Sequence, residues 1–417
     1  MTISPEANVR EDDTTGDGPL AGVRVLDLTR VLAGPYATML LGDAGAEVVK
    51  VEPPQGDETR QWGPPWAGGE SAYYLCINRN KRSIALDLAK PGGLTILRRL
   101  ASQSDVLIEN YKHGTMERWG LGYEEVLRAE NPGLIYASIT GFGSTGPYAQ
   151  LPGYDTVMEA MGGLMSITGE PEGEPVKVGV AIVDIVTGCL AAWGISAALA
   201  ERARTGRGRR VELSLLDSAL SLLINQASSF LIGGNVPKRY GNAHPTIVPY
   251  QTFPTAAGPL MVATANDRQF ARFCEVIGLP GLPGEERFRT NRQRVVHREE
   301  LLPLIEGALA AKTAAEWNDL CWEAGVPVGP VRDIAQAFDD PQVAARGSVT
   351  RIAHPTAGEV PLVASPVRFA AGAPQPYRHP PLLGEHTVEV LAEAGFGEAE
   401  IAGWVGDGTV RVLSRES

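Results

Sequence analysis

The chain has 417 residues, 44% of them hydrophobic, and its 37 Lys and Arg against 49 Asp and Glu give a formal net charge of −12. This apolar fraction is typical of a folded protein, and the length allows about two or three domains that each bury a core. The chain lacks a block of basic residues, which nucleic acids and anionic membranes need, so we expect neither as a partner.

Residues 1–19 are rich in Asp, Glu, Thr and Gly, and they lack the basic start and apolar stretch of a signal peptide. We therefore expect a flexible N-terminal tail. The four cysteines lie far apart and show no spacing typical of a metal site. We expect reduced thiols, no metal and a cytoplasmic location.

The first large region alternates strands with helices. VRVLDL at residues 23–28 is followed by a helical ATMLLGDAG and a second strand, EVVKVE. The pattern continues with strands SIALDL, DVLIEN and LIYASITG, separated by helices near 92–103 and 123–129. Apolar strands separated by helices indicate a parallel sheet with both faces covered. The sequence therefore predicts a large Rossmann-like α/β domain over residues 20–229.

The carboxyl ends of these strands form the expected binding edge, with Arg30, Glu52, Asn110 and Gly141 at it. The first of these loops, DLTRVLAGP, has one glycine and carries Pro35 where a dinucleotide fingerprint needs glycines. This argues against a nicotinamide cofactor and favours a structural role for Glu52.

A strand-like run near residue 180 reaches Asp184 and then turns into a long apolar helix. Residues 182–200 are almost apolar enough for a membrane span, but Asp184 lies inside them, so a buried core helix is the preferred interpretation. The spacing predicts that Asp184 caps this helix. Its apolar surroundings are unusual for a mere cap, which leaves a functional carboxylate open.

The composition changes near residue 230, where a strand and a long apolar helix lead into a loop of Gly, Pro and basic residues. Strand-like PLMVATAN and GVPVGPV and helices over 268–277, 299–311 and 314–324 predict a smaller α+β domain, residues 230–345. Residues 346–417 read as a Pro-rich return linker and C-terminal helices that pack on the large domain.

Seven segments, taken together, resemble the class III CoA-transferase family, in order: LAGVRVLDLTRVLAGPYATMLLGDAGAEVVKVE, GDETRQWGPP, NRNKRSIALDL, ENYKHG, SITGFGSTGPY, GYDTVMEAMGGLMSITG and PLLGEHT. The resemblance runs from about Leu20 to the C-terminus. It is strongest to the branch that exchanges CoA between succinyl-CoA and glutarate, through AYYLCINRNKRS, TIVPYQTF and GVPVGP.

The resemblance implies that Asp184, four residues before Gly188, is the catalytic nucleophile. Its carboxylate would attack the donor thioester, and an aspartyl-CoA thioester would then pass CoA to an acceptor acid. A coenzyme A thioester is then a co-substrate, and no cofactor is bound permanently. The family further implies a homodimer of two interlocked chains.

Family positions for binding CoA carry over to Val31, Leu32, Ala33, Leu86, Asp87, Leu88, Ala89, Asn110, Tyr111, Lys112, Arg118, Tyr154 and Asp155. Lys112 and Arg118 would supply charge for the phosphates, or they are solvated surface charges. Leu32 replaces the glutamine of formyl-CoA transferases, which argues against oxalate or formate chemistry. The loop over 241–247 either closes over the intermediate or is an ordinary turn.

A dicarboxylate acceptor needs a cation for its far carboxylate. Arg79 is the first candidate, with Arg30, Arg60 and His244 as further ones, and a structural ion pair is the alternative role of Arg79. Trp62 and Tyr73 match aromatic positions of the acyl pocket, although packing in the core is the ordinary role of such residues.

Two alternatives stay open. The family's α-methylacyl-CoA racemases carry His directly before the Asp of this segment, and here Tyr154 precedes Asp155, which disfavours racemisation. A non-catalytic acyl-CoA-binding protein is the second alternative, and the retained Asp184 argues against it.

Overall fold

The computed structural model describes residues 18–369 and 377–413. The expected flexible tail lies outside these residues except for Gly18 and Pro19. The described residues form two compact units, of which the second comprises Gly163–Val178 and Leu223–Arg346 and the first comprises the other described residues. Residues 163–178 and 223–229, which the sequence placed in the large domain, group with the second unit.

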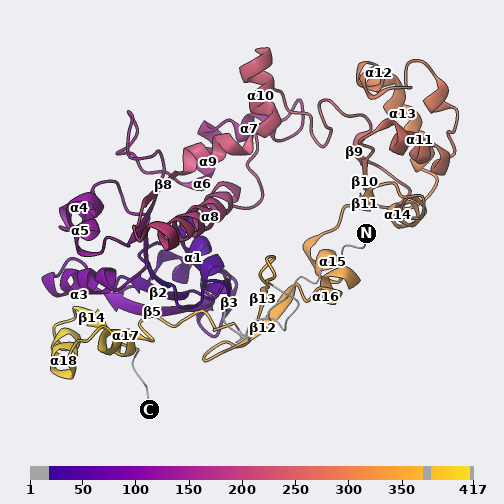
Figure 1. Cartoon of the computed structure of the whole chain (residues 1–417). Coiled ribbons are helices and arrows are strands. Elements are labelled where there is room, and N and C mark those ends of the chain that lie inside the picture. Colours follow the sequence, from indigo (N-terminus) through magenta and orange to yellow (C-terminus); the bar gives the residue numbers. More distant parts are fainter. Residues whose placement is uncertain (1–17, 370–376, 414–417) are drawn as a thin grey trace, which may run out of the picture. The chain divides into compact units, whose positions relative to one another are not determined.

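The first unit is built on a sheet whose seven described strands lie in the order β14-β5-β2-β1-β6-β7-β8. Figure 1 labels β14, β5, β2 and β8 of these strands. Its strands are β1 (Arg24–Asp27), β2 (Glu47–Glu52), β5 (Lys81–Leu86), β6 (Val106–Glu109), β7 (Ile135–Thr140), β8 (Arg210–Ser214) and β14 (Val410–Arg411). All neighbours pair in parallel except β14, which is antiparallel to β5. Numbered along the chain, the parallel strands lie in the order 3-2-1-4-5-6 of a doubly wound fold. The predicted α/β class is confirmed.

The two faces of this sheet form two separate cores. Within β1, Val25 belongs to one core and Leu26 to the other, because successive side chains of a strand point to opposite faces. Helices that contribute buried residues to the Val25 core are α1 (Ala33–Asp43), α6 (Asp155–Met161), α8 (Ile182–Thr205) and α9 (Leu215–Leu222). Those of the Leu26 core are α3 (Pro91–Ser102), α4 (Thr115–Arg118), η2 (Tyr123–Leu127), α17 (Thr387–Glu393) and α18 (Glu398–Gly406). Figure 1 labels α3, α4, α17 and α18 of these.

Helix α8 packs closely against α1 at Gly188, where a Cβ atom would lie 2.7 Å from the carbonyl oxygen of Ala33. A glycine is needed for this approach because that oxygen belongs to the backbone and cannot move aside. The contact brings the first turns of α8 beside the start of α1. By length and composition α8 could also cross a membrane, because an 18-residue window within it has a mean hydropathy of 1.8, and so could α9 and α10 (Ile224–Gly233) if the pair were one span.

Shorter elements complete the first unit: η1 (Glu58–Gln61), β3 (Trp66–Ala67), β4 (Glu70–Ser71), α2 (Ala72–Leu75), η2 (Tyr123–Leu127), α5 (Arg128–Glu130), β12 (Val349–His354) and β13 (Gly358–Val363). The β12–β13 hairpin occurs in the segment predicted to be a Pro-rich linker. Its alternating burial, with Ile352, Val360 and Leu362 buried, is the period of a strand with one covered face.

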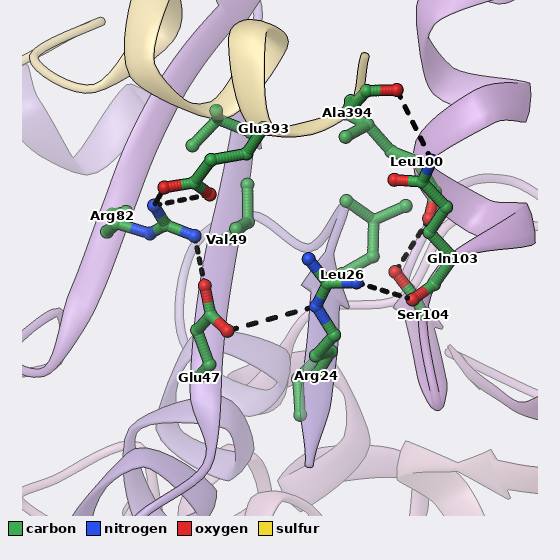
Figure 2. A pocket seen from close by; sticks show the side chains of 12 residues that line it. Arg24, Leu26, Glu47, Val49, Arg82, Leu100, Gln103, Ser104, Glu393 and Ala394 are labelled. Atoms are coloured by element: carbon green, nitrogen blue, oxygen red, sulfur yellow. Dashed lines mark hydrogen bonds and ion pairs between the residues drawn. The ribbon is translucent and has the colours of Figure 1, made fainter. Parts of the chain in front are cut away.

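An ion-pair network lies at the amino ends of β1, β2 and β5 (Figure 2). Arg82 pairs with Glu47 and with Glu393 of α17, and Arg24 lies 3.9 Å from Glu47. The pocket between these side chains has a volume of about 30 Å³, the space of roughly one water molecule. This edge therefore joins α17 to the sheet and has no room for a CoA ester.

The second unit contains the antiparallel sheet β11-β10-β9 and a helical layer, an α+β arrangement. Its core includes Phe253, Phe270, Phe273, Leu301 and Trp317, all buried. The elements are α7 (Leu164–Ile167), α10, β9 (Tyr250–Phe253), β10 (Leu260–Ala263), α11 (Asp267–Val276), η3 (Leu282–Gly284), α12 (Asn291–Val296), α13 (Arg298–Leu309), α14 (Ala314–Glu323), β11 (Val328–Pro330), α15 (Ile334–Phe338) and α16 (Pro341–Ala345).

Candidate active site

A cavity of about 210 Å³ lies where the strand order reverses between β1 and β6. Its walls are the loops after β1, β6 and β7, the first turn of α8 and the start of α9. Its lining residues are Arg30, Val31, Leu32, Ala33, Glu58, Asn110, Tyr111, Lys112, His113, Ile139, Thr140, Gly141, Ala149, Leu151, Pro152, Gly153, Tyr154, Asp184 and Leu215. Doubly wound folds bind ligands at this switch point, outside the carboxyl ends of the strands.

Asp184 is the third residue of α8 and lines this cavity. The prediction that it caps the helix is wrong, because the capping acceptor is Asp155. The N–H groups of Val183 and Asp184 donate to Asp155 Oδ1 at 2.8 and 3.1 Å. The strand predicted before the helix is also absent, since residues 175–181 of the described chain form no regular element. Asp155 thus supplies the cap from the start of α6.

The Asp184 carboxylate accepts no hydrogen bond from any of the described residues. Burial in the cavity wall, together with the charge of Asp155, raises the pKa of Asp184 from its ordinary 3.8 to about 7. Burial and the charge of Asp184 in turn raise the pKa of Tyr73 to about 12, so that this phenol stays neutral. A partly buried carboxylate with a raised pKa, facing a ligand-sized space, is suited to act as a nucleophile or a base.

The loop after β1 is tied to the loop after β6 by one side chain. The N–H of Arg30 donates to Asn110 Oδ1 at 2.9 Å, and Asn110 Nδ2 donates to the Arg30 carbonyl oxygen at 2.9 Å. The amide therefore replaces a pair of backbone hydrogen bonds beyond the end of the two strands. This bond fixes Arg30 and its neighbours at the cavity edge.

Most residues predicted to bind CoA are brought together. Those that line the cavity are Val31, Leu32, Ala33, Asn110, Tyr111, Lys112 and Tyr154. The segment Leu86–Ala89 is absent from the lining, because Leu86 is fully buried beside β14 and the N–H of Asp87 donates to the Thr409 carbonyl. Arg118 is exposed, donates to Thr115 Oγ1 at 2.7 Å and is likewise absent from the lining. Asp155 acts on α8 as described above.

The structure corrects the first choice for the acceptor cation. Arg79 is 2% exposed, and its guanidinium binds Asp43 through Nε and Nη2 at 2.8 and 2.6 Å and the Val363 carbonyl through Nη1 at 2.7 Å. All three nitrogens of the Arg79 guanidinium therefore have partners within the protein, and Arg79 forms the structural ion pair that was the alternative prediction. Arg60 is committed in the same way, to Glu52 at 2.8 Å. Glu52 is accordingly structural.

The remaining predicted substrate residues are partly placed. Trp62 and Tyr73 form an edge-to-face pair with centroids 5.1 Å apart, and Trp62 is 41% exposed, so it is not a core residue. Asp184 influences the Tyr73 phenol electrostatically, which puts this ring in the same neighbourhood. His244 belongs to the second unit, where its Nδ1 accepts from the N–H of Thr246 at 3.2 Å. Its role, like that of the loop 241–247, stays a prediction.

Sequence reasoning missed the buried pair Lys50 and Asp57, which supports the loop after β1. The available signal was Lys50 itself, a charged residue in the otherwise apolar centre of EVVKVE. A lysine there must find a partner, because an unpaired buried charge is very unfavourable. Among the described residues no cluster of His, Cys, Asp and Glu could hold a metal ion.

Comparisons with known proteins identify the family. The profile of CoA-transferase family III matches residues 20–387. The succinate–glutarate CoA-transferase of Agrobacterium fabrum is 46% identical over 90% of this chain and 95% of its own length. The mouse succinyl-CoA:glutarate CoA-transferase is 44% identical over 92% of this chain and 88% of its own. A crystal structure of a CAIB/BAIF family protein from Brucella suis, 43% identical, covers 91% of this chain and 100% of its own with a TM-score of 0.80. The chain therefore belongs to CoA-transferase family III and is an enzyme of the transferase class.

Proposed function

We propose that this enzyme transfers CoA from succinyl-CoA to glutarate through an aspartyl-CoA thioester on Asp184. The named activities of the two relatives at 44% and 46% identity support the choice of substrates. The observation that carries the proposal is the Asp184 carboxylate. It lines the cavity at the switch point, it makes no hydrogen bond to a described residue, and its pKa is raised to about 7.

The reaction proceeds by four acyl transfers that use no water. The Asp184 carboxylate attacks the succinyl thioester carbon, which forms a mixed anhydride and releases CoA thiolate. The thiolate then attacks the aspartyl carbonyl of the anhydride, which gives aspartyl-CoA thioester and free succinate. Glutarate attacks this thioester to give a second anhydride and CoA thiolate. The thiolate finally attacks the glutaryl carbonyl, which yields glutaryl-CoA and restores Asp184.

The environment of Asp184 suits each of these steps. One thioester replaces another, so the exchange needs no external energy source. A carboxylate whose pKa is near 7 is a stronger nucleophile than an ordinary aspartate, yet about half of it is ionised at neutral pH. Partial burial also limits the water that could hydrolyse the anhydride.

Arg30 is the best candidate among the described residues for the far carboxylate of the acceptor. Unlike Arg79, it lines the cavity together with Asp184. Its Nη1 pairs with Glu58 at 3.1 Å, a partner whose side chain is half exposed, and its buried Nε has no hydrogen-bond partner in the described chain. An exposed pair of this kind is weak and exchanges readily for a bound anion. Lys112, also in the lining, is then available to a CoA phosphate.

A homodimer of interlocked chains is the proposed assembly, and exposed apolar side chains support it. Trp193 on α8 is 71% exposed, and Leu231 and Ile232 on α10 are 77% and 87% exposed. Neighbouring exposed apolar side chains such as Leu231 and Ile232 are a feature of protein interfaces, and closed symmetric dimers are the commonest oligomers. Sedimentation at micromolar concentration tests this, and a monomer would contradict it. A cytoplasmic location and the use of CoA thioesters without a resident cofactor belong to the same proposal.

A mass measurement tests the catalytic assignment. Incubation with succinyl-CoA alone should add the mass of a CoA thioester to the peptide containing Asp184, and hydroxylamine or glutarate should remove it. Asp184→Asn should give neither the adduct nor glutaryl-CoA. An adduct on another residue, or transfer by the Asn variant, would refute the assignment of Asp184.

A further inference from the structure

A buried ion pair lies beneath the loop after β1. Lys50 Nζ, from β2, lies 2.9 Å from Asp57 Oδ2, and the two side chains are 0% and 1% exposed. Asp57 also accepts hydrogen bonds from the N–H and the hydroxyl of Thr59 at 3.0 and 2.8 Å and so caps the N-terminus of η1. Three donors outside the loop after β1 therefore fix the position of the Asp57 carboxylate.

The pair grips the loop at two points. Lys50 Nζ donates to the Thr29 carbonyl at 2.9 Å. The N–H of Val31 faces both Asp57 oxygens at 3.3 and 3.4 Å. Between these points the side chain of Asn110 holds both backbone groups of Arg30. Three consecutive residues of the loop are thus held by side chains from outside it.

These hydrogen bonds lie where the loop backbone has an unfavourable conformation. Val31 has φ of +66°, in the left-handed region that glycine favours and that a β-branched residue adopts rarely. Such a conformation persists only where the surroundings impose it. The consequence reaches the active site, since Val31, Leu32 and Ala33 line the same cavity as Asp184 and Ala33 is the first residue of α1.

Both members of the pair are charged at neutral pH. Burial opposes ionisation of Asp57, but the charge of Lys50 and the donors of Thr59 lower its pKa to about 2. Burial likewise opposes the charge on Lys50, and Asp57, Asp27 and Glu52 together raise its pKa above the ordinary value. The ion pair and its hydrogen bonds to the loop are therefore retained around neutral pH.

We infer that Lys50 and Asp57 are positioning residues for CoA transfer: they hold Val31 in the left-handed conformation and so keep the cavity loop in the shape that presents the thioester to Asp184. This inference rests on the proposed role of Asp184. Neither residue touches the reacting atoms. They act by increasing the fraction of molecules in which the loop has the conformation needed for the reaction.

The test is the rate of aspartyl-CoA formation in a single turnover with succinyl-CoA. The double variant Lys50→Met/Asp57→Ala removes both charges together, so that no buried charge is left unpaired. Releasing a residue from the left-handed region should reduce the competent population, and hence the rate, by about 5- to 30-fold. The milder Lys50→Met/Asp57→Asn also removes both charges but retains a side-chain oxygen for the N–H groups of Thr59 and Val31. It should show a smaller loss, and it serves if the first double variant does not fold.

A second background separates positioning from general stability. Glycine adopts positive φ about as readily as negative φ, so in Val31→Gly the same double change should reduce the rate by about 2-fold at most. The matched control is Asp43→Ala/Arg79→Met, which removes an ion pair whose side chains are 2% and 3% exposed and do not line the cavity. It should lower the melting temperature and leave the rate of adduct formation unchanged.

Each outcome decides one question. If wild-type protein forms no adduct at Asp184, the proposed function is wrong, and this failure is independent of Lys50 and Asp57. If the wild type forms it and the double variant forms it equally fast, the inference is overturned. An equal loss in the Val31→Gly background, or an equal loss in the control, would also overturn it.

Discussion

Replacement of Asp184 by Asn should abolish the adduct and at the same time stabilise the protein. Burial and the charge of Asp155 raise the pKa of Asp184 from 3.8 to about 7, which means that the fold disfavours its ionised form. Asn has the same shape and no charge. The variant therefore removes an unfavourable interaction that the enzyme retains for its chemistry.

The magnitude and the sign follow from the two pKa values. A shift of about three units corresponds to about 4 kcal/mol as an upper bound. Asp184 is only partly buried, and solvent screening reduces the expected gain to about 1–2 kcal/mol. Between pH 4 and 7 the unfolded chain ionises at this residue while the folded protein retains the proton. Wild-type stability at this site therefore falls as pH rises through that window and is constant above it.

Urea unfolding of both proteins at pH 5 and pH 8 measures the effect. The stability advantage of Asp184→Asn should be larger at pH 8 than at pH 5. Asp217 provides a matched control, because it is also the third residue of a helix, α9, but is exposed. Asp217→Asn should lose the favourable helix-dipole interaction of about 0.3–1 kcal/mol. An Asp184→Asn protein no more stable than wild type at pH 8, or an advantage that does not grow with pH, would refute the reasoning.

Three further predictions concern neighbouring residues. Asp155→Asn keeps an acceptor for the first turn of α8 but removes a charge that raises the pKa of Asp184, so the rise of the adduct rate with pH should move to lower pH in a pH–rate profile; an unmoved profile would contradict this. Arg30→Met should raise KM for glutarate more than for a monocarboxylic acid, whereas Arg79→Met should leave both KM values unchanged and lower the melting temperature; steady-state kinetics against both acids would expose the reverse pattern. Gly188→Ala places a Cβ 2.7 Å from a carbonyl oxygen of α1, and thermal unfolding should show a loss of about 1–3 kcal/mol; unchanged stability would mean that the helices separate freely.

The fold could be predicted from the sequence where local period and tertiary structure agree. The alternation of strands and helices from β1 to β7 identified the α/β class, because parallel strands buried on both faces are apolar throughout. The sequence did not predict the β12–β13 hairpin, because its alternating strands are short and prolines such as Pro361 interrupt the strand pattern. The single long helix expected near residue 220 is interrupted: α9 ends at Leu222 and α10 begins at Ile224, whose φ is +39°. A local conformation of this kind leaves no pattern in an apolar stretch.

The site was predictable to the extent that it follows from strand ends. Val31 and Asn110 follow β1 and β6, so parallel pairing alone brings them to one edge. Side-chain partners could not be predicted in this way. Arg79 is bound by Asp43, and no local spacing connects the two residues because they are separated by 36 positions.

The division of labour between Asp155 and Asp184 explains how this fold obtains a reactive carboxylate. The first N–H groups of α8 stabilise whichever carboxylate they bind, by about 1–2 kcal/mol. Had Asp184 been the cap, these donors would have lowered its pKa and its nucleophilicity together. Asp155, 28 positions earlier than Val183, takes the donors instead. Its charge then acts on Asp184 in the same direction as burial, so the helix end is satisfied and the nearby carboxylate is left basic.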